Sequence, residues 1–183
     1  MVPGIIGTKE LLELVKSQNL IENLCERELN QPEGAGFDLR AGAVYRLGRG
    51  ETILGIEKRI GPEVGEPLAK HGVHKEVVLR PGVFYLVETL ESLNLPENIC
   101  ALFQPRSTLQ RSGITFHSAT GNPGYKGKLT FGLYNAGGED FILELGARFS
   151  HAIFYRTGDN VRKYGGQWQG GRVSLEGKSE VQV

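Results

Sequence analysis

The sequence predicts an all-β protein built as a sandwich or barrel of the jelly-roll kind. Glycine is unusually frequent, with 26 of 183 residues, and eight prolines accompany it without a collagen period. Many short apolar runs are separated by turn residues, and only one segment has clear helical periodicity. The length fits one domain, and no internal repeat is found. We therefore expect a single β domain over residues 1–163 and a flexible C-terminal arm over residues 164–183.

The one clear helix is predicted at residues 8–19. Thr8 is placed to cap its first turn. Leu11, Leu14 and Val15 recur at helical spacing and share one face, which should pack on the β domain. A short extended segment and a loop follow, at 20–24 and 31–36.

Alternating or apolar runs bounded by turn residues predict the strands. In chain order they are 37–47, 76–89 with a central Pro-Gly turn, 93–104 after an initial turn, 114–119, 128–135, 140–146 and 147–156. Residues 108–112 are expected to form one helical turn. The Gly-, Glu- and Lys-rich segment 48–76 is expected to be a modestly ordered excursion, with a short strand at 53–56.

Composition and charge exclude several classes of protein. The formal net charge is zero, so no global field recruits nucleic acid. No apolar run approaches 18 residues, and the N-terminus lacks the features of a signal peptide. Cys25 and Cys100 have apolar neighbours and are interpreted as buried or partly buried thiols of a reduced compartment. The histidines form no zinc motif. We expect a cytoplasmic protein that binds neither nucleic acid nor membrane.

The most informative stretch is 104–135. Arg106, Ser107 and Thr108 place a cation and two hydroxyls on successive residues, and Arg111 follows one helical turn after Ser107. Arginine donors, hydroxyls and free backbone N–H groups suit phosphate oxygens. Taken alone, the same residues also fit a solvated surface turn.

Two further segments can be interpreted either as part of a binding site or as ordinary surface structure. The segment 163–174 combines glycines and glutamines with the only tryptophan, Trp168. Its glycines allow close backbone approach to a ligand and the indole offers a stacking face, although composition alone fits a disordered tail equally well. Asp38 and Arg40 share one face of the strand 37–47, which by itself indicates a solvated strand face.

In order along the chain, these segments resemble the five motifs of the trimeric dUTPase and dCTP deaminase superfamily. The resemblance covers nearly all of residues 8–174 and is strongest in the second motif. The motifs lie at 36–42, 105–114, 122–127, 145–154 and 163–174. The N-terminal helix and glutamine-rich tail favour the deaminase branch, which includes archaeal-type dUTPases and bifunctional enzymes.

This resemblance implies a distorted, dUTPase-like jelly-roll β-barrel with the N-terminal helix and a glycine-rich C-terminal arm. It also implies a homotrimer with sites between subunits. The ligand would be a deoxypyrimidine nucleoside triphosphate, with Mg²⁺ held through its phosphates and not by protein ligands.

The resemblance also implies roles for individual residues. Arg106 and Ser107 would hold phosphates, Thr108 would belong to the same substrate-binding group, and Arg111 would line the site. Tyr125 would pack under the deoxyribose and exclude a 2′-hydroxyl. The backbone near Ala119 and Thr120 would contact the base edge. In the arm, Tyr164, Gln167 and Gln169 would contact phosphates or base, and Trp168 would stack on the ligand. Asp38 would organise the fold and the region of the metal site.

Two departures from the family pattern bear on the chemistry. The deaminase general base would be a Glu five residues past the third motif, where this chain has Gly132. A glycine cannot transfer a proton, and Glu139 and Asp140 lie beyond the strand end. The usual base of a dUTPase, the third-motif Asp, is Asn122 here, which orients a water but does not accept its proton at pH 7. Asp38 or a carboxylate from a neighbouring subunit could replace it.

We therefore expect a dUTP diphosphatase that yields dUMP and pyrophosphate. A dCTP deaminase or a bifunctional enzyme is the alternative. A catalytically disarmed homologue that binds a nucleotide, or one that acts on a modified pyrimidine nucleotide, is a further alternative.

Overall fold

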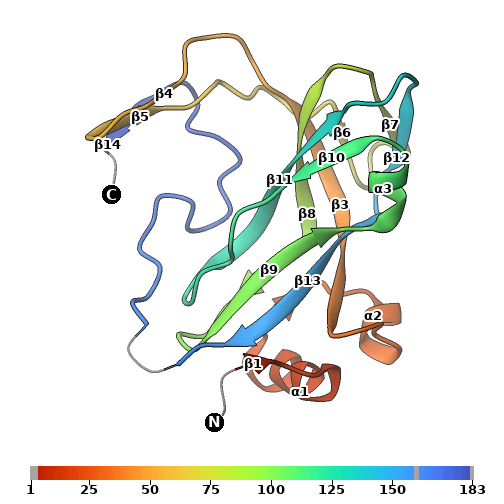
Figure 1. The fold of residues 1–183 in the computed structure, drawn as a ribbon, viewed down its shortest axis with the longest axis vertical. Coiled ribbons are helices and arrows are strands. Elements are labelled where there is room, and N and C mark those ends of the chain that lie inside the picture. The colour runs from red at the N-terminus through yellow and green to blue at the C-terminus, as the bar shows by residue number, and fades with distance from the viewer. Residues whose placement is uncertain (1–3, 159–160, 182–183) are drawn as a thin grey trace.

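The computed structural model describes residues 4–158 and 161–181. Its main feature is a curled antiparallel sheet with few helices (Figure 1), which confirms the all-β class. The strands are β1 Gly4–Ile5, β2 Ile21–Glu22, β3 Gly36–Arg46, β4 Ile53–Leu54, β5 Lys58–Ile60, β6 Ala69–Lys70, β7 Glu76–Leu79, β8 Phe84–Asn94, β9 Ile99–Pro105, β10 Ile114–His117, β11 Lys126–Asn135, β12 Phe141–Glu144, β13 Arg148–Arg156 and β14 Ser179–Val181. The helices are α1 Thr8–Gln18, α2 Glu26–Asn30 and α3 Ser107–Arg111.

The N-terminal helix forms where its periodicity predicts. Leu11 and Leu14 are buried, so the predicted apolar face packs on the domain. The predicted capping by Thr8 is wrong: Gly7 is the N-cap residue and no side chain caps the helix. Thr8 is instead the first helical residue. The short helix α2 was not predicted, because five polar-rich residues carry no helical periodicity.

Strand β3 joins the two layers of the curled sheet. Residues 36–40 pair with β13, and residues 41–46 pair with β8. The register shifts between Ala41 and Ala43, and a Cβ on the intervening Gly42 would lie 2.8 Å from the carbonyl oxygen of Thr89. Only glycine fits this close approach, so the sheet bends at this bulge and encloses the core.

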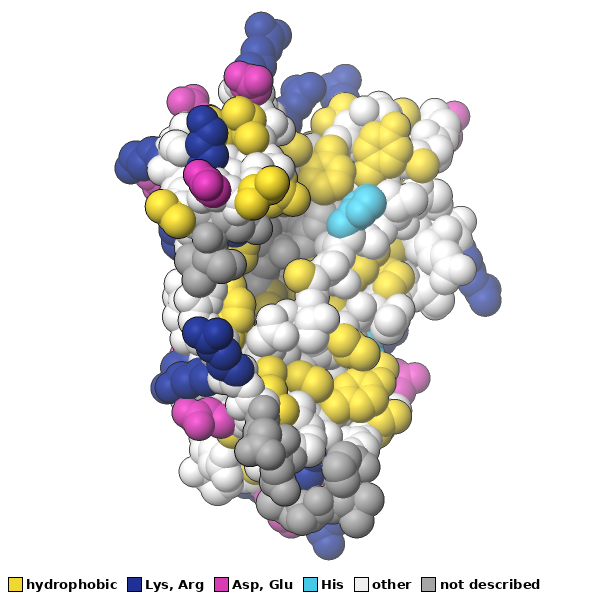
Figure 2. Space-filling model, turned by 60° about the vertical axis from the view of Figure 1, so that its left-hand side comes forward, with side chains coloured by type: hydrophobic (Ala, Val, Ile, Leu, Met, Phe, Trp, Pro, Cys, Tyr) yellow, Lys and Arg dark blue, Asp and Glu magenta, His cyan; other side chains and the backbone are white. Residues whose placement is uncertain are grey.

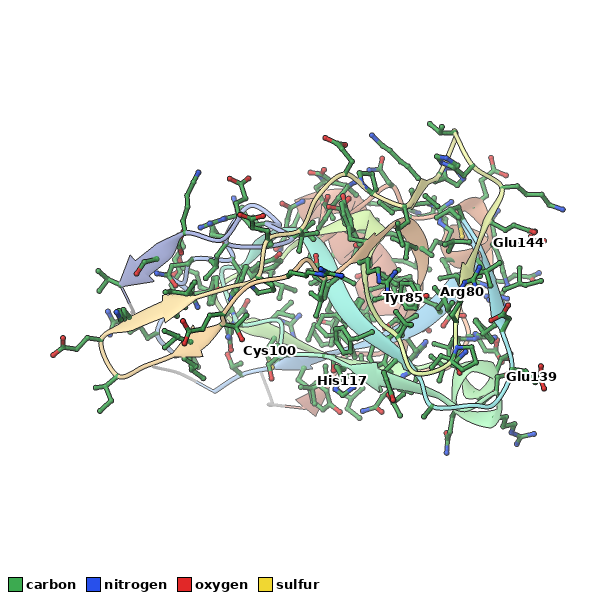
Figure 3. The ribbon with its side chains drawn as sticks, turned by 90° about the horizontal axis from the view of Figure 1, so that it is seen from above. Arg80, Tyr85, Cys100, His117, Glu139 and Glu144 are labelled. Atoms are coloured by element: carbon green, nitrogen blue, oxygen red, sulfur yellow. The ribbon has the colours of Figure 1, made fainter. Side chains whose placement is uncertain are left out.

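Aromatic side chains fill the interior between the layers. The ring of Phe131, on β11, lies 5.1 Å from that of Phe103, 5.0 Å from that of Phe116 and 5.6 Å from that of Phe149. Residues on β8 alternate strictly between buried and partly exposed. Tyr85, also on β8, is buried, and its hydroxyl accepts a hydrogen bond from the backbone N–H of Arg80 at 2.9 Å (Figure 3).

The excursion after β3 is more ordered than predicted. The strand β5 pairs with β4 on one side and with the C-terminal strand β14 on the other, and this small sheet projects from the barrel (Figure 1). Both cysteines are free and partly buried, as expected. Within residues 4–158 and 161–181, no helix is long and apolar enough to cross a membrane.

Candidate functional site

A cavity of about 430 Å³ lies between the turn before β11, the first half of β11 and the C-terminal arm. Its size is typical of a site for a small organic ligand. Figure 2 shows this side of the molecule hollowed, with hydrophobic side chains bordering the hollow. The lining residues are Leu86, Phe103, Ala119, Thr120, Gly121, Asn122, Tyr125, Lys128, Leu129, Thr130, Phe131, Tyr164, Trp168, Arg172 and Val173.

The turn at one edge of the cavity is built from Asn122, Pro123, Gly124 and Tyr125. The N–H of Tyr125 donates to the carbonyl of Asn122 at 3.0 Å, and Gly124 has φ +81°. Proline second and a left-handed glycine third are the requirements of a type II turn. The turn fixes the backbone of Asn122 at the rim of the cavity, where its side chain is free to contact a ligand.

Tyr125 forms an apolar wall. The side chain is 8% exposed, its hydroxyl donates to the carbonyl of Lys128 at 2.5 Å, and its ring meets that of Tyr164 edge-on at 5.7 Å. Burial, and then the nearby Tyr164 and Glu88, raise the pKa of Tyr125 to about 12. The phenol is therefore neutral at physiological pH and offers a flat surface for packing.

The arm is held against the turn by its own hydrogen bonds. Gln169 accepts from the N–H of Lys126 through Oε1 and donates to the carbonyl of Gly124 through Nε2, both at 3.0 Å. A Cβ on Gly127 would lie 2.5 Å from the nitrogen of Gly171, and one on Gly171 would lie 2.7 Å from the nitrogen of Lys128. The glycines were predicted to let the backbone approach a ligand closely. In the structure they let the arm approach β11 closely.

A bulge shapes the β11 side of the cavity. The register with β8 shifts between Lys128 and Thr130, and the N–H of Leu129 donates to the Thr89 hydroxyl at 3.1 Å in place of a strand partner. Bulges of this kind redirect side chains beside binding sites. Lys128 lines the cavity while its ammonium contacts the Glu88 carboxylate at 2.8 Å.

The position of the missing deaminase Glu is filled by another side chain. A Cβ on Gly132 would lie 2.4 Å from Cζ of Phe84 and 3.1 Å from Cβ of His117. The Phe84 and His117 rings pack at 5.4 Å. Figure 3 shows Glu139 beside α3, near the end of the molecule opposite the β4–β5 hairpin. Neither Gly132 nor Glu139 supplies a carboxylate to this cavity.

A second cluster of predicted residues surrounds Asp38, away from the cavity. The Asp38 carboxylate pairs with Arg106, with Arg148 at 2.9 Å and with Nδ1 of His151 at 2.8 Å. Asp38 is 1% exposed, so the strand face that seemed solvated from sequence is buried. Its backbone N–H donates to the buried Glu28 at 3.0 Å.

The charges around Asp38 keep it ionised. Burial alone would raise its pKa, but the hydrogen bond from His151 and the positive charges of Arg106, His151 and Arg148 hold it below its usual value. A carboxylate with three cationic or hydrogen-bonding partners is a weak base for a water. Asp38 therefore organises this cluster, and the chain's own fold does not bring it to the cavity.

The structure divides the predicted site residues into two groups. Six of them line the cavity: Ala119, Thr120, Asn122, Tyr125, Tyr164 and Trp168. Gln169 supports the arm from outside the lining, and Gln167 donates to the carbonyl of Val181. Arg106, Asp38 and the α3 residues Ser107, Thr108 and Arg111 are not among the lining residues.

Sequence reasoning missed both cations of the lining, Lys128 and Arg172. Lys128 could have been found because it lies two residues before Thr130 in a predicted strand, where such residues share one face. Arg172 had no comparable signal, since its place depends on how the arm docks. Among the lining residues there is no carboxylate: Glu88 contacts Lys128, and Glu180 contacts Arg172 at 2.7 Å.

The curled barrel, the turn and the arm over the cavity together define a small-ligand-binding β protein, and comparison with known proteins gives its family. The model for dCTP deaminase-like proteins matches residues 5–157, so the chain belongs to this family. The probable deoxyuridine 5′-triphosphate nucleotidohydrolase of Methanopyrus kandleri is 39% identical over 137 residues, or 74% of this chain and 86% of that protein. The dCTP deaminase of Pyrococcus horikoshii is 37% identical over 158 residues, or 85% of this chain and 88% of that protein.

A solved structure supports the same fold. The 2′-deoxycytidine 5′-triphosphate deaminase from Agrobacterium tumefaciens matches with a TM-score of 0.65 at 21% identity, covering 85% of this chain and 49% of that chain. Both enzyme names occur among relatives of nearly equal identity. The choice between the two reactions therefore depends on the site.

Proposed function

We propose that this protein is a dUTP diphosphatase that hydrolyses dUTP to dUMP and pyrophosphate. The observation that carries the choice is the Phe84 ring over Gly132. Deamination at the pyrimidine C4 needs a base that activates water and passes its proton to the leaving amine. Here the position expected for that base is Gly132, which has no side chain. The Phe84 ring fills the space that a side chain at this position would need.

The cavity suits a deoxynucleotide. The flat, neutral Tyr125 fits the packing surface expected under a deoxyribose, where a 2′-hydroxyl would have no room. The backbone of Ala119 and Thr120 is available to read a base edge. Lys128 and Arg172 supply positive charge for phosphate oxygens, with Arg172 being capable of bidentate contact.

The separation of the two residue groups supports a site shared between subunits. A triphosphate needs more positive charge than Lys128 and Arg172 provide, since each already contacts a carboxylate. Ser107, Thr108 and Arg111 are exposed on α3. A homotrimer in which one chain's α3 faces another chain's cavity would complete the site, with Arg106 and Ser107 contributing phosphate contacts.

The donor set is consistent with Mg²⁺ carried by the nucleotide. Among the described residues no group of three His, Cys, Asp or Glu could hold a metal, and the cavity lining is free of carboxylates. A magnesium ion would therefore be held by phosphate oxygens and would neutralise their charge in the bound nucleotide. The chain's own residues would position the nucleotide and the water.

Asn122 is the residue best placed to orient the attacking water. Its amide oxygen can accept a hydrogen bond from water, but it cannot take up the proton. Loss of a general base typically lowers a rate by about 10²–10⁴-fold. The protein should therefore be a slow hydrolase, unless a carboxylate other than the buried Asp38 reaches the cavity from a neighbouring chain.

A disarmed nucleotide-binding protein is the second candidate, because the cavity lining lacks a carboxylate. Product analysis with dUTP, dCTP and Mg²⁺ distinguishes the candidates. The proposed function requires dUMP and pyrophosphate from wild type, with kcat rising about 10²-fold or more in Asn122→Asp. Asn30→Asp, at the exposed end of α2, is the matched control and should leave the rate unchanged.

The other outcomes are equally specific. Nucleotide-dependent stabilisation without product, together with gained activity in Asn122→Asp, would establish the disarmed binding protein. Release of ammonia from dCTP would establish a deaminase and overturn the argument from Gly132.

A further inference from the structure

The C-terminal arm is anchored on the β4–β5 hairpin. Strand β14 pairs with β5 over three residues, with Glu180 opposite Arg59. Further up the arm, Leu175 is 2% exposed and packs on Gly61, where a Cβ would lie 3.0 Å from the leucine side chain. Figure 1 shows the arm running from the end of β13 to this projecting sheet. A strand and a buried apolar side chain thus tie the arm to residues 58–61.

Arg59 connects this anchor to the cavity. Its guanidinium lies over the Trp168 ring at 5.0 Å, and its Nη2 lies 3.8 Å from Oε2 of Glu180. The Arg59 and Glu180 side chains are 17% and 23% exposed, so solvent screens these charges only partly. Trp168 and Arg172 line the cavity, whereas Arg59 does not.

Glu180 extends the link to the second cation of the cavity. Its Oε1 accepts from Nη2 of Arg172 at 2.7 Å, so one carboxylate contacts both arginines. Arg172 also donates to the carbonyl of Gln167 at 3.4 Å. Trp168 and Arg172 are therefore each held by a residue of the small β4–β5–β14 sheet.

We propose that Arg59 is a positioning residue that acts through Trp168. We also propose that the β4–β5 hairpin, by pairing with β14 near the end of the arm, forms a latch that holds the arm over the cavity. All of these contacts are made within one chain. An arm that is already in place loses little conformational freedom when a ligand binds, so the latch strengthens binding by preorganisation. The consequence for substrate rests on the proposed function, but the latch itself does not.

Trp168 is the only tryptophan in the chain, so its fluorescence reports on the arm alone. Its side chain is 37% exposed. In Arg59→Gln the indole should shift its emission to longer wavelength, and acrylamide quenching should rise about twofold as the arm opens locally. Glu180→Gln should shift the signal in the same direction, and Arg59→Lys should restore part of it because a lysine also stacks on indole.

Arg49→Ala is the matched control. Arg49 is exposed on the same excursion and forms no hydrogen bond or ion pair with another described residue. It should leave the fluorescence unchanged. Melting temperatures of all variants, followed by circular dichroism, separate opening of the arm from unfolding of the domain.

The kinetic consequence is a rise in KM for dUTP of about 3- to 10-fold in Arg59→Gln, with kcat changing less, because preorganisation acts on binding. Unchanged Trp168 quenching in both Arg59→Gln and Glu180→Gln would overturn the latch. Tighter nucleotide binding by Glu180→Gln would also overturn it, since Glu180 would then compete with phosphate for Arg172. If wild type hydrolyses no dUTP, the proposed function fails while the fluorescence still decides the latch.

Discussion

The surroundings of Gly132 show how core packing limits the side chains that a position of the site can carry. The neighbouring Phe131 anchors the aromatic core, so the strand cannot slip by one residue without exposing that ring. Position 132 must then point to the opposite face, against Phe84 and His117. A glutamate at this position would have to displace the Phe84 ring as well as add a carboxylate.

This packing predicts the effect of Gly132→Ala. The new methyl group meets Cζ of Phe84 at 2.4 Å, so the ring must shift and the free energy of unfolding should fall by about 1–3 kcal/mol. Combining it with Phe84→Ala should give a double variant at least about 1 kcal/mol more stable than the sum of the single changes predicts. Urea unfolding of the four proteins measures this coupling, and additive changes would show that the ring does not oppose the side chain.

Asp38 predicts a pH dependence of stability. Because its folded pKa lies below the ordinary value of 3.8, its contribution is fully present above that value and is lost as the pH falls through the folded pKa. Asp38→Asn should lower the free energy of unfolding at pH 7 by about 2–3 kcal/mol, since it leaves Arg106 without its carboxylate partner and Arg148 with only the longer contact to Glu28 at 3.5 Å.

The difference between wild type and Asp38→Asn should begin to shrink below pH 3.8, where the carboxyl becomes protonated in the unfolded chain, and should be lost fully only below the folded pKa. Urea unfolding of both proteins at pH 7 and at pH 3 tests this. An equal difference at the two pH values would show that Asp38 contributes by packing and not by charge.

At the scale of elements, the sequence predicted the helices, strands and turns that depend on interactions between residues close together in the chain. The face of α1 and most strands follow from periodicity, and the turn at 122–125 follows from its proline and glycine. The small sheet could not be predicted, because Lys58–Ile60 pairs with a segment more than a hundred residues later in the chain. No local signal marks such a non-local pairing.

The candidate site divides in the same way. The residues of the 119–125 turn were predicted as a group because they are contiguous in the chain. The burial of Asp38 was not, because its alternating pattern describes the strand but not the arginines that reach it from β13 and the start of α3. The contact of Arg59 with Trp168 likewise depends on the docked arm.

At the scale of the whole molecule, the proposed site shared between subunits predicts complementation between damaged chains. Arg111→Ala damages only the α3 half, and Asn122→Ala damages only the cavity half. Each variant alone should lose most of the dUTPase activity. In mixed oligomers assembled from equal amounts of both, roughly a quarter of the sites combine an intact α3 with an intact cavity from another chain. Co-refolding the two variants and measuring pyrophosphate release should therefore recover about that fraction of wild-type activity, while light scattering reports a trimer. A site contained within one chain would recover nothing, because every chain in the mixture carries one damaged half.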